Sequence, residues 1–156
     1  MKKLILSSAV ALGIVSTMVG QSQVTANIYQ EYSDKKDVLS MSLNYPLMDI
    51  LDIDLDINDQ LRHIRGDVYQ VKFIAFGDES NPGKSLGMID RKLASSDLVE
   101  LRVPEDMDEE EYRLLKFYGV KNGSYYSDIC MLMLDDDGET GVFIAVNGKI
   151  KIHSAP

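Results

Sequence analysis

The sequence predicts an α+β domain with a mainly antiparallel sheet of five or six strands, two or three helices packed mostly on one face, and a C-terminal β-meander. Two observations lead to this prediction. Helical spacing of apolar residues ends near Ser95, and short apolar or alternating runs separated by turn residues follow it. The pairs Asn122-Gly123 and Asp137-Gly138 are typical of two-residue hairpin loops.

Helices and strands alternate in the first part of the chain. A short helix is expected at 27–34, where apolar residues are spaced to share one face, and a half-buried strand at 38–43. Pro46 is expected to begin a second helix. Period-two alternation then interrupts this helix, which resumes at 58–64.

The second half contains one helix and most of the strands. The run 68–76 predicts a strand, and a helix is expected from Pro82 to Ser95. The β-meander that follows it is assigned to the runs 98–103, 112–118, 129–134 and 142–147.

The first residues have the pattern of a secretory signal peptide. Lys2 and Lys3 precede a run, 4–19, that is apolar apart from small Ser, Thr and Gly residues. The run is short for a membrane span. We therefore expect export to the periplasm or cell envelope, with an uncleaved anchor as the alternative.

Cleavage of this segment is expected between residues 20 and 26. Ala26 ends the best small-residue cleavage site, so that 1–26 would be the signal peptide. Cutting after Gly20 or Ser22, which exposes a Gln, is the alternative.

The mature chain, 27–156, is expected to form one domain without a transmembrane segment. Its charge argues against one class of partner: the whole chain has 25 acidic and 16 basic residues, a net charge of −9 at pH 7, and no basic stripe. Such a chain repels phosphate backbones, so nucleic acid is not expected as a partner. Cys130 is the only cysteine and is expected to be a buried small hydrophobe.

The stretch "FIAFGDESNPGKS", 73–85, looks like a phosphate-binding loop, but its spacing is wrong. Such loops have four residues between the first Gly and the Gly-Lys-Ser/Thr, and here five separate Gly77 from Gly83. Pro82 also removes one N–H donor. We therefore expect Asn81 to cap a helix whose first residue is Pro82.

The remaining candidate sites also fail on spacing. "DIDLDINDQ", from Asp52, begins like a calcium loop but has Ile57 where the glycine must stand. His63 and His153 are far apart and lie in no metal-ligand pattern. No catalytic, cofactor-binding or metal-binding residue is assigned, and no cofactor is expected.

The two hairpin loops predict a register for the meander. Two-residue loops would place Met131 between Leu114 and Ile144, and Tyr126 opposite Gly119, whose backbone it could cover. One face would then pack under the helices, with Ile129, Met131, Met133, Val142, Ile144 and Val146. The other face is also apolar, with Leu115, Phe117, Cys130, Leu132, Phe143 and Ala145.

The second apolar face must be covered, because an antiparallel sheet open to water normally has polar residues there. The candidates within the chain are the helix at 27–34 and the segment 98–103. The alternative cover is a partner chain or a ligand.

The chain resembles a family of exported bacterial proteins catalogued as domain of unknown function 4252. The resemblance covers Tyr29 to Ile150 and rests on the leader, "YQEYSDKKDVLSMSL", "VYQVKFIAF" and "DICMLMLDDDGETGVFIAVNGKI". It implies an envelope location and a small α+β domain, and it implies no activity or cofactor. Many such proteins look like lipoproteins, but this chain lacks the lipid-attachment cysteine.

These observations favour a noncatalytic binding or structural module of the bacterial envelope, with an unknown protein or a small ligand as partner and with homo-oligomers left open. The alternative is a hydrolase with an unrecognised carboxylate site. The candidate partner-binding residues are Leu132, Phe143, Phe117, Tyr118, Tyr125 and Tyr126.

Overall fold

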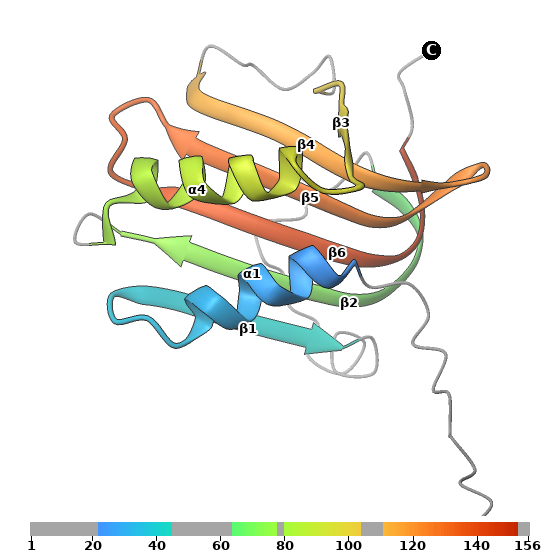
Figure 1. Ribbon diagram of the computed structural model, residues 1–156, viewed down its shortest axis with the longest axis horizontal. Helices are drawn as coiled ribbons and strands as arrows, with labels where there is room; N and C mark the ends of the chain where they lie inside the picture. Colours follow the sequence, from blue (N-terminus) through green and yellow to red (C-terminus); the bar gives the residue numbers. More distant parts are fainter. Residues whose placement is uncertain (1–21, 45–63, 78–79, 104–110, 153–156) are drawn as a thin grey trace, which may run out of the picture.

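The computed structural model describes residues 22–44, 64–77, 80–103 and 111–152. They form an α+β domain in which two helices lie on the same face of a six-stranded antiparallel sheet (Figure 1). The strand order is β1-β2-β6-β5-β4-β3, so the last three long strands form the expected meander. The predicted fold class is confirmed.

The helices are α1 (Gln23–Ser33) and α4 (Pro82–Ala94). The strands are β1 (Val38–Asn44), β2 (Ile64–Phe76), β3 (Val99–Leu101), β4 (Tyr112–Asn122), β5 (Tyr125–Asp135) and β6 (Gly141–Ile152). The helix predicted from Pro46 and most of its continuation at 58–64 lie outside the described residues, and Ile64 is already in β2.

Helix α4 begins as the sequence predicted. The side chain of Asn81 accepts a hydrogen bond from the N–H of Lys84 at 3.2 Å, and Pro82 occupies the first turn. Gly83 and Lys84 are therefore helical residues, and their stretch is not a phosphate-binding loop.

Helix α1 begins at Gln23, four residues before the predicted start. Its extra residues are integral to the domain, because Thr25 is fully buried and Val24 packs against the core. The spacing of Ile28 and Tyr32 predicted the later part of the helix, and both side chains are buried. The rings of Tyr32 and Phe76 on β2 form an edge-to-face pair, with centroids 5.4 Å apart and an interplanar angle of 86°.

The helices cover the face of the sheet opposite to the one predicted. Leu132 and Phe143 are fully buried beneath them, and Ile89 of α4 belongs to the same core. For this face the sequence left two kinds of cover open, a segment of the chain itself, with the helix at 27–34 as one candidate, or a partner chain or ligand; in the structure α1 and α4 cover it. The assignment of the other face to the helices was wrong. Alternation shows which residues share a face, but it does not show which face packs against the helices when both faces are apolar.

The second face is buried as well. Its side chains form a separate cluster that consists of Val71, Phe117, Ile129, Met131, Ile144, Val146 and Ile150. The sheet therefore separates two apolar layers.

The predicted register is right for β5–β6 and wrong for β4–β5. Met131 pairs with Ile144 as expected, but its β4 partner is Phe117 and not Leu114. The β4–β5 loop lies one residue further along than predicted, since Asn122 already pairs with Tyr125, and the register shifts once more near Val120. The shifted loop and the register shift near Val120 both pair each β4 residue with a later residue of β5 than predicted. As a result, Phe117 lies on the second face and not beside Leu132.

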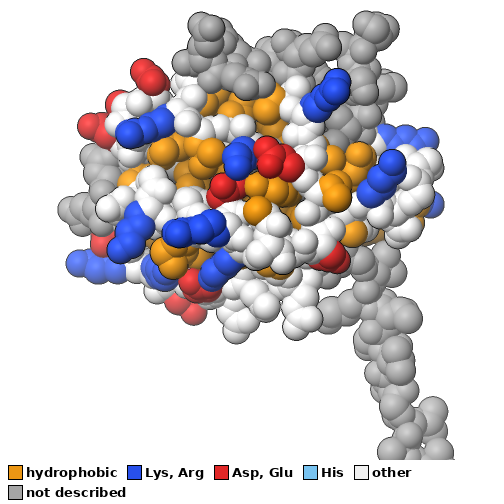
Figure 2. Space-filling view, turned by 45° about the horizontal axis from the view of Figure 1, so that its top comes forward, with side chains coloured by type: hydrophobic (Ala, Val, Ile, Leu, Met, Phe, Trp, Pro, Cys, Tyr) orange, Lys and Arg blue, Asp and Glu red, His pale blue; other side chains and the backbone are white. Residues whose placement is uncertain are grey.

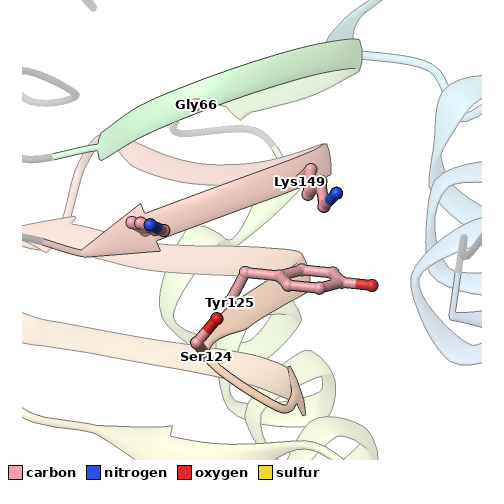
Figure 3. Close-up of a pocket in the computed structure, with 5 residues that line it drawn as sticks. Gly66, Ser124, Tyr125 and Lys149 are labelled. Atoms are coloured by element: carbon pink, nitrogen blue, oxygen red, sulfur yellow. The ribbon is translucent and has the colours of Figure 1, made fainter.

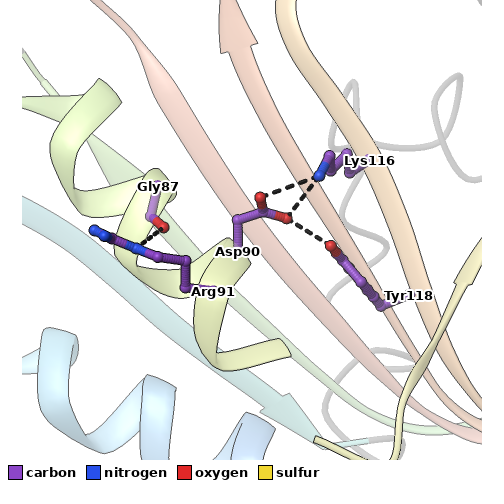
Figure 4. A network of polar contacts seen from close by, with 5 residues as sticks. All are labelled: Gly87, Asp90, Arg91, Lys116 and Tyr118. Atoms are coloured by element: carbon purple, nitrogen blue, oxygen red, sulfur yellow. Dashed lines mark hydrogen bonds and ion pairs between the residues drawn. The ribbon is translucent and has the colours of Figure 1, made fainter. Parts of the chain in front are cut away.

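A polar network fastens α4 to the sheet (Figure 4). Asp90 of α4 accepts a hydrogen bond from the Tyr118 hydroxyl at 2.6 Å and pairs with the Lys116 ammonium at 3.1 Å. Burial and the neighbouring carboxylate raise the pKa of Tyr118 well above its ordinary value. The phenol therefore remains a neutral donor to Asp90.

Strands β2 and β6 approach each other closely at two glycines. A Cβ at Gly148 would lie 2.1 Å from the carbonyl oxygen of Asp67, and one at Gly66 would lie 2.1 Å from that of Lys149. Gly66 also has a φ of +134°. This pairing therefore requires glycine at both positions.

We expect Tyr118→Phe to lower the free energy of unfolding by about 1–2 kcal/mol, because it removes a hydrogen bond to a charged acceptor. Urea denaturation followed by circular dichroism measures the change. Tyr112→Phe, which removes a hydroxyl from the same strand, is the control, and equal losses in the two variants would contradict a role for Asp90.

We expect Gly148→Ala to destabilise the domain by about 2 kcal/mol or more, since the new methyl group would overlap backbone atoms of β2. Gly87→Ala, in the middle of α4 with no atom within 4 Å of the added Cβ, should stabilise it by about 0.5–1 kcal/mol. Thermal unfolding of the pair tests both signs, and a neutral Gly148→Ala would refute the close approach.

Candidate ligand-binding pocket

A pocket of about 450 Å³ opens at the end of the sheet where β2, β5 and β6 meet (Figure 3). Its described lining consists of Gly66, Ser124, Tyr125, Lys149 and Lys151. The side chains of Tyr125 and Lys149 extend in the same direction from neighbouring strands (Figure 3). The pocket thus combines an aromatic ring, a hydroxyl group and two ammonium groups.

The alternation of β5 and β6 explains this arrangement. Tyr126 pairs with Ile150, and both pack into the second apolar face. The residues next to them, Tyr125, Lys149 and Lys151, therefore point to the side of the sheet that bears the helices. This end of the sheet extends past the start of α1 (Figure 1), so the helices do not fill the space.

The described lining of the pocket is basic, although the protein as a whole is acidic and Asp67 of β2 pairs with Lys149. Lys149 and Lys151 are exposed, and none of the described lining residues is acidic. The Lys149 ammonium lies 5.3 Å from the centroid of the Tyr125 ring. Within the described parts of the chain neither lysine forms an ion pair. Charges of both signs are interspersed elsewhere, as Figure 2 shows for one face.

The ladder is irregular beside the pocket. The register of β2–β6 shifts between Val68 and Gln70, and that of β5–β6 shifts between Tyr126 and Asp128. Such irregularities bend strands and re-aim side chains, and they are frequent beside functional sites.

The structure separates the six predicted partner-binding residues. Leu132, Phe143 and Tyr118 are at most 1% exposed, on the helix side, and Phe117 is buried on the second face. Tyr125 lines the pocket. Tyr126 is half-buried beside the pocket, and its partner on β4 is Lys121. Its ring still covers Gly119, because it lies 2.9 Å from the place where a Cβ of Gly119 would stand.

The two lysines of the pocket were missed by the sequence analysis. Their signal was the alternation in "GKIKI", which places Lys149 and Lys151 on one side of a strand and two isoleucines on the other. It was overlooked because the predicted strand ended at Asn147, whereas β6 continues to Ile152.

A second hollow, of about 350 Å³, lies between the end of α1 and the start of α4. Its lining includes Lys35, Lys36 and Lys84, so it is also basic. Several of its polar side chains have partners within the hollow, however. Lys35 lies over the Tyr32 ring at 3.8 Å, and the Ser85 hydroxyl donates to the carbonyl oxygen of Ser80. We therefore rank it below the Tyr125 pocket.

A buried carboxylate, that of Asp128, lies on β5 between the pocket and the middle of the sheet. Asp128 is 2% exposed and pairs with Asn147, whose amide donates to its Oδ1 at 3.2 Å. Its Oδ2 accepts a hydrogen bond from the backbone N–H of Ser22, at the start of α1. The carboxylate therefore caps a helix N-terminus, which also favours negative charge there.

Burial raises the pKa of Asp128 to about 6, although hydrogen bonds from Asn147 and Ser22 and the charge of Lys72 act to lower it. A raised pKa is common in catalytic carboxylates. Here its cause is burial in a capping position, and a group this enclosed offers no surface to a substrate.

The described residues show no metal-binding cluster and no membrane-spanning helix. Over the described ranges, no three His, Cys, Asp or Glu side chains are grouped so that they could hold a metal ion. Neither helix in these ranges is long and apolar enough to cross a bilayer. The calcium-like stretch from Asp52, His63 and His153 lie outside the described residues.

Residues 32–154 match the sequence profile of the family described as Domain of unknown function (DUF4252). The match covers most of the chain, so the protein belongs to this family, as the resemblance predicted. No curated protein and no solved structure matches the chain.

We expect Asp128 to make the fold more stable in mild acid. Its pKa of about 6 exceeds the ordinary 3.8, so the folded state takes up the proton first. The resulting stabilisation, about 2–3 kcal/mol, is complete below pH 4 and is lost as the pH rises through 6. Urea midpoints measured between pH 4 and pH 8 should show this rise toward acid.

Asp128→Asn should flatten this dependence, whereas Asp136→Asn, which removes an equal charge from an exposed loop, should leave it intact. Identical pH profiles for the two variants would show that Asp128 is not the responsible group.

Proposed function

We propose that this protein is a noncatalytic binding module of the bacterial cell envelope, and that its Tyr125 pocket holds an anionic group of a small ligand or of a partner protein. The pocket residues Tyr125, Lys149 and Lys151 carry this proposal: two ammonium groups beside an aromatic ring, without an acidic neighbour in the described lining.

The chemistry of these groups defines the ligand class. Two lysine ammonium groups can each donate to the oxygens of a carboxylate or a phosphate. The Tyr125 ring offers a flat apolar surface, and the Ser124 hydroxyl lies within the same lining. A ligand with an anionic group next to a planar or apolar part suits this combination. The negative net charge of the chain makes nucleic acid an unsuitable partner.

The envelope location rests on the leader. Lys2 and Lys3 followed by an apolar run are typical of a secretory signal. A binding protein outside the cytoplasm needs a stable domain with an accessible site, and the pocket at the ends of β5 and β6 is such a site. The hydrolase alternative gains little support. Among the described residues, the carboxyl group whose pKa is strongly raised is that of Asp128, which is buried and serves as a helix cap.

A titration with benzoate tests the pocket, since benzoate joins a carboxylate to a flat ring. We expect saturable shifts in amide NMR spectra of the isotopically labelled protein at Tyr125, Lys149 and Lys151. Binding should weaken as salt is added, because the charges are exposed. Benzamide, the neutral analogue, should bind at least tenfold more weakly.

The double variant Lys149→Gln/Lys151→Gln should weaken benzoate binding at least tenfold. Lys36→Gln/Lys84→Gln removes the same charge from the second hollow and is the matched control. Equal losses in both double variants, or shifts centred on Lys84, would contradict assignment of the site to Tyr125.

A further inference from the structure

We propose that two copies of this protein form a symmetric dimer in which β1 (Val38–Asn44) of one copy pairs antiparallel with β1 of the other. Met41 lies on the two-fold axis, which stands perpendicular to the sheet. The two six-stranded sheets then continue into each other, with the helices of both copies on the same side.

Strand β1 is an edge strand that lacks the features by which proteins usually prevent pairing at an edge. It is the first strand in the order of the sheet, and β2 is its partner among the described strands (Figure 1). Edges are usually protected by short strands, charged residues, proline or bulges. The other edge, β3, is three residues long and contains Glu100. By contrast, β1 has seven residues, none of which is charged or proline, and its register with β2 continues without a shift.

The sequence of β1 matches itself when two copies run in opposite directions. The stretch "LSMSL", 39–43, reads the same both ways around Met41. Antiparallel pairing centred on Met41 therefore places each of these residues opposite one of its own kind. The pairs are Leu39 with Leu43, Ser40 with Ser42, and Met41 with Met41 of the other copy. This self-complementarity favours a second copy of the chain over an unrelated strand as the partner.

The pairing covers an exposed apolar side chain. Leu39 is 67% exposed, the largest value among the large apolar side chains of the described residues. It lies on the second face of the sheet, because Met41 and Leu43, which share its side of β1, pair with Phe73 and Val71. In the dimer, Leu39 of each copy lies against Leu43 of the other, so that the second apolar layer continues from one copy to the next.

On the helix side the pairing is polar. The Ser40 hydroxyl donates to the carbonyl oxygen of Ser33 at 3.1 Å, so its own oxygen can still accept a hydrogen bond. Ser42 of the second copy, which is exposed, lies opposite Ser40 and can supply that hydrogen bond. No residue of β1 is charged, so the paired strands of two acidic chains bring no like charges together.

Sedimentation equilibrium of the protein purified from cells that express the full chain tests the dimer. We expect a dimer, and a protein that remains monomeric up to its highest soluble concentration would overturn the inference. Met41→Lys puts two like charges opposite each other on the axis, so it should weaken dimerisation at least tenfold. Val99→Lys, which adds the same charge at an exposed position of the other edge, is the matched control. Equal effects of the two variants would contradict an interface at β1.

A matched pair of cysteine variants tests the register. Met41→Cys places two thiols on the axis, with Cα atoms about 4.5–5.5 Å apart, which is within the range of a disulfide. Leu39→Cys places them four residues apart along the strands, about 14 Å, which is beyond that range. Cys130 is fully buried and does not compete.

Mild oxidation of the folded variants should give a covalent dimer from Met41→Cys and none from Leu39→Cys, although position 39 is the more exposed of the two. Non-reducing gel electrophoresis measures the difference. A covalent dimer from Leu39→Cys, or from neither variant, would overturn pairing centred on Met41.

Discussion

The packing of two helices across the centre of a doubly apolar sheet is the constraint on which the rest of the molecule depends. Residues at the middle of β5 are buried whichever face they point to. Those on one face lie under α1 and α4, and those on the other belong to the second apolar cluster. The Tyr32–Phe76 contact joins α1 to the sheet, and the Asp90–Tyr118 hydrogen bond joins α4 to it. Neither helix can move without opening this core.

Because α1 and α4 cover the middle of the sheet, the two hollows lie near its ends. The two basic hollows lie at opposite ends of α1, one beside Tyr125 and one beside Lys84. Each is bounded by the ends of strands or helices whose middle parts pack into the core. Binding at such a place requires little rearrangement of the backbone, which keeps the entropy cost of association low.

The sequence was informative wherever a local pattern had a single meaning. Proline after Asn81 marked the start of α4, and the apolar runs marked the strands. The face that packs against the helices could not be found in this way, since alternation in a sheet buried on both sides is symmetric. The β4 register failed for a different reason: a displaced loop and a bulge depend on contacts between strands. Asp128 was missed because its burial depends on α1, whose first turn lay in a segment expected to be removed.

The lone thiol of Cys130 has a consequence for how the molecule withstands oxidants. It is fully buried, and burial raises the pKa of the thiol well above its ordinary value, so almost no reactive thiolate forms in the folded state. Disulfide exchange and alkylation must wait until the central strand separates from its neighbours. When modification is fast compared with closing, the rate at which a maleimide modifies this sulfur therefore equals the rate at which the strand separates.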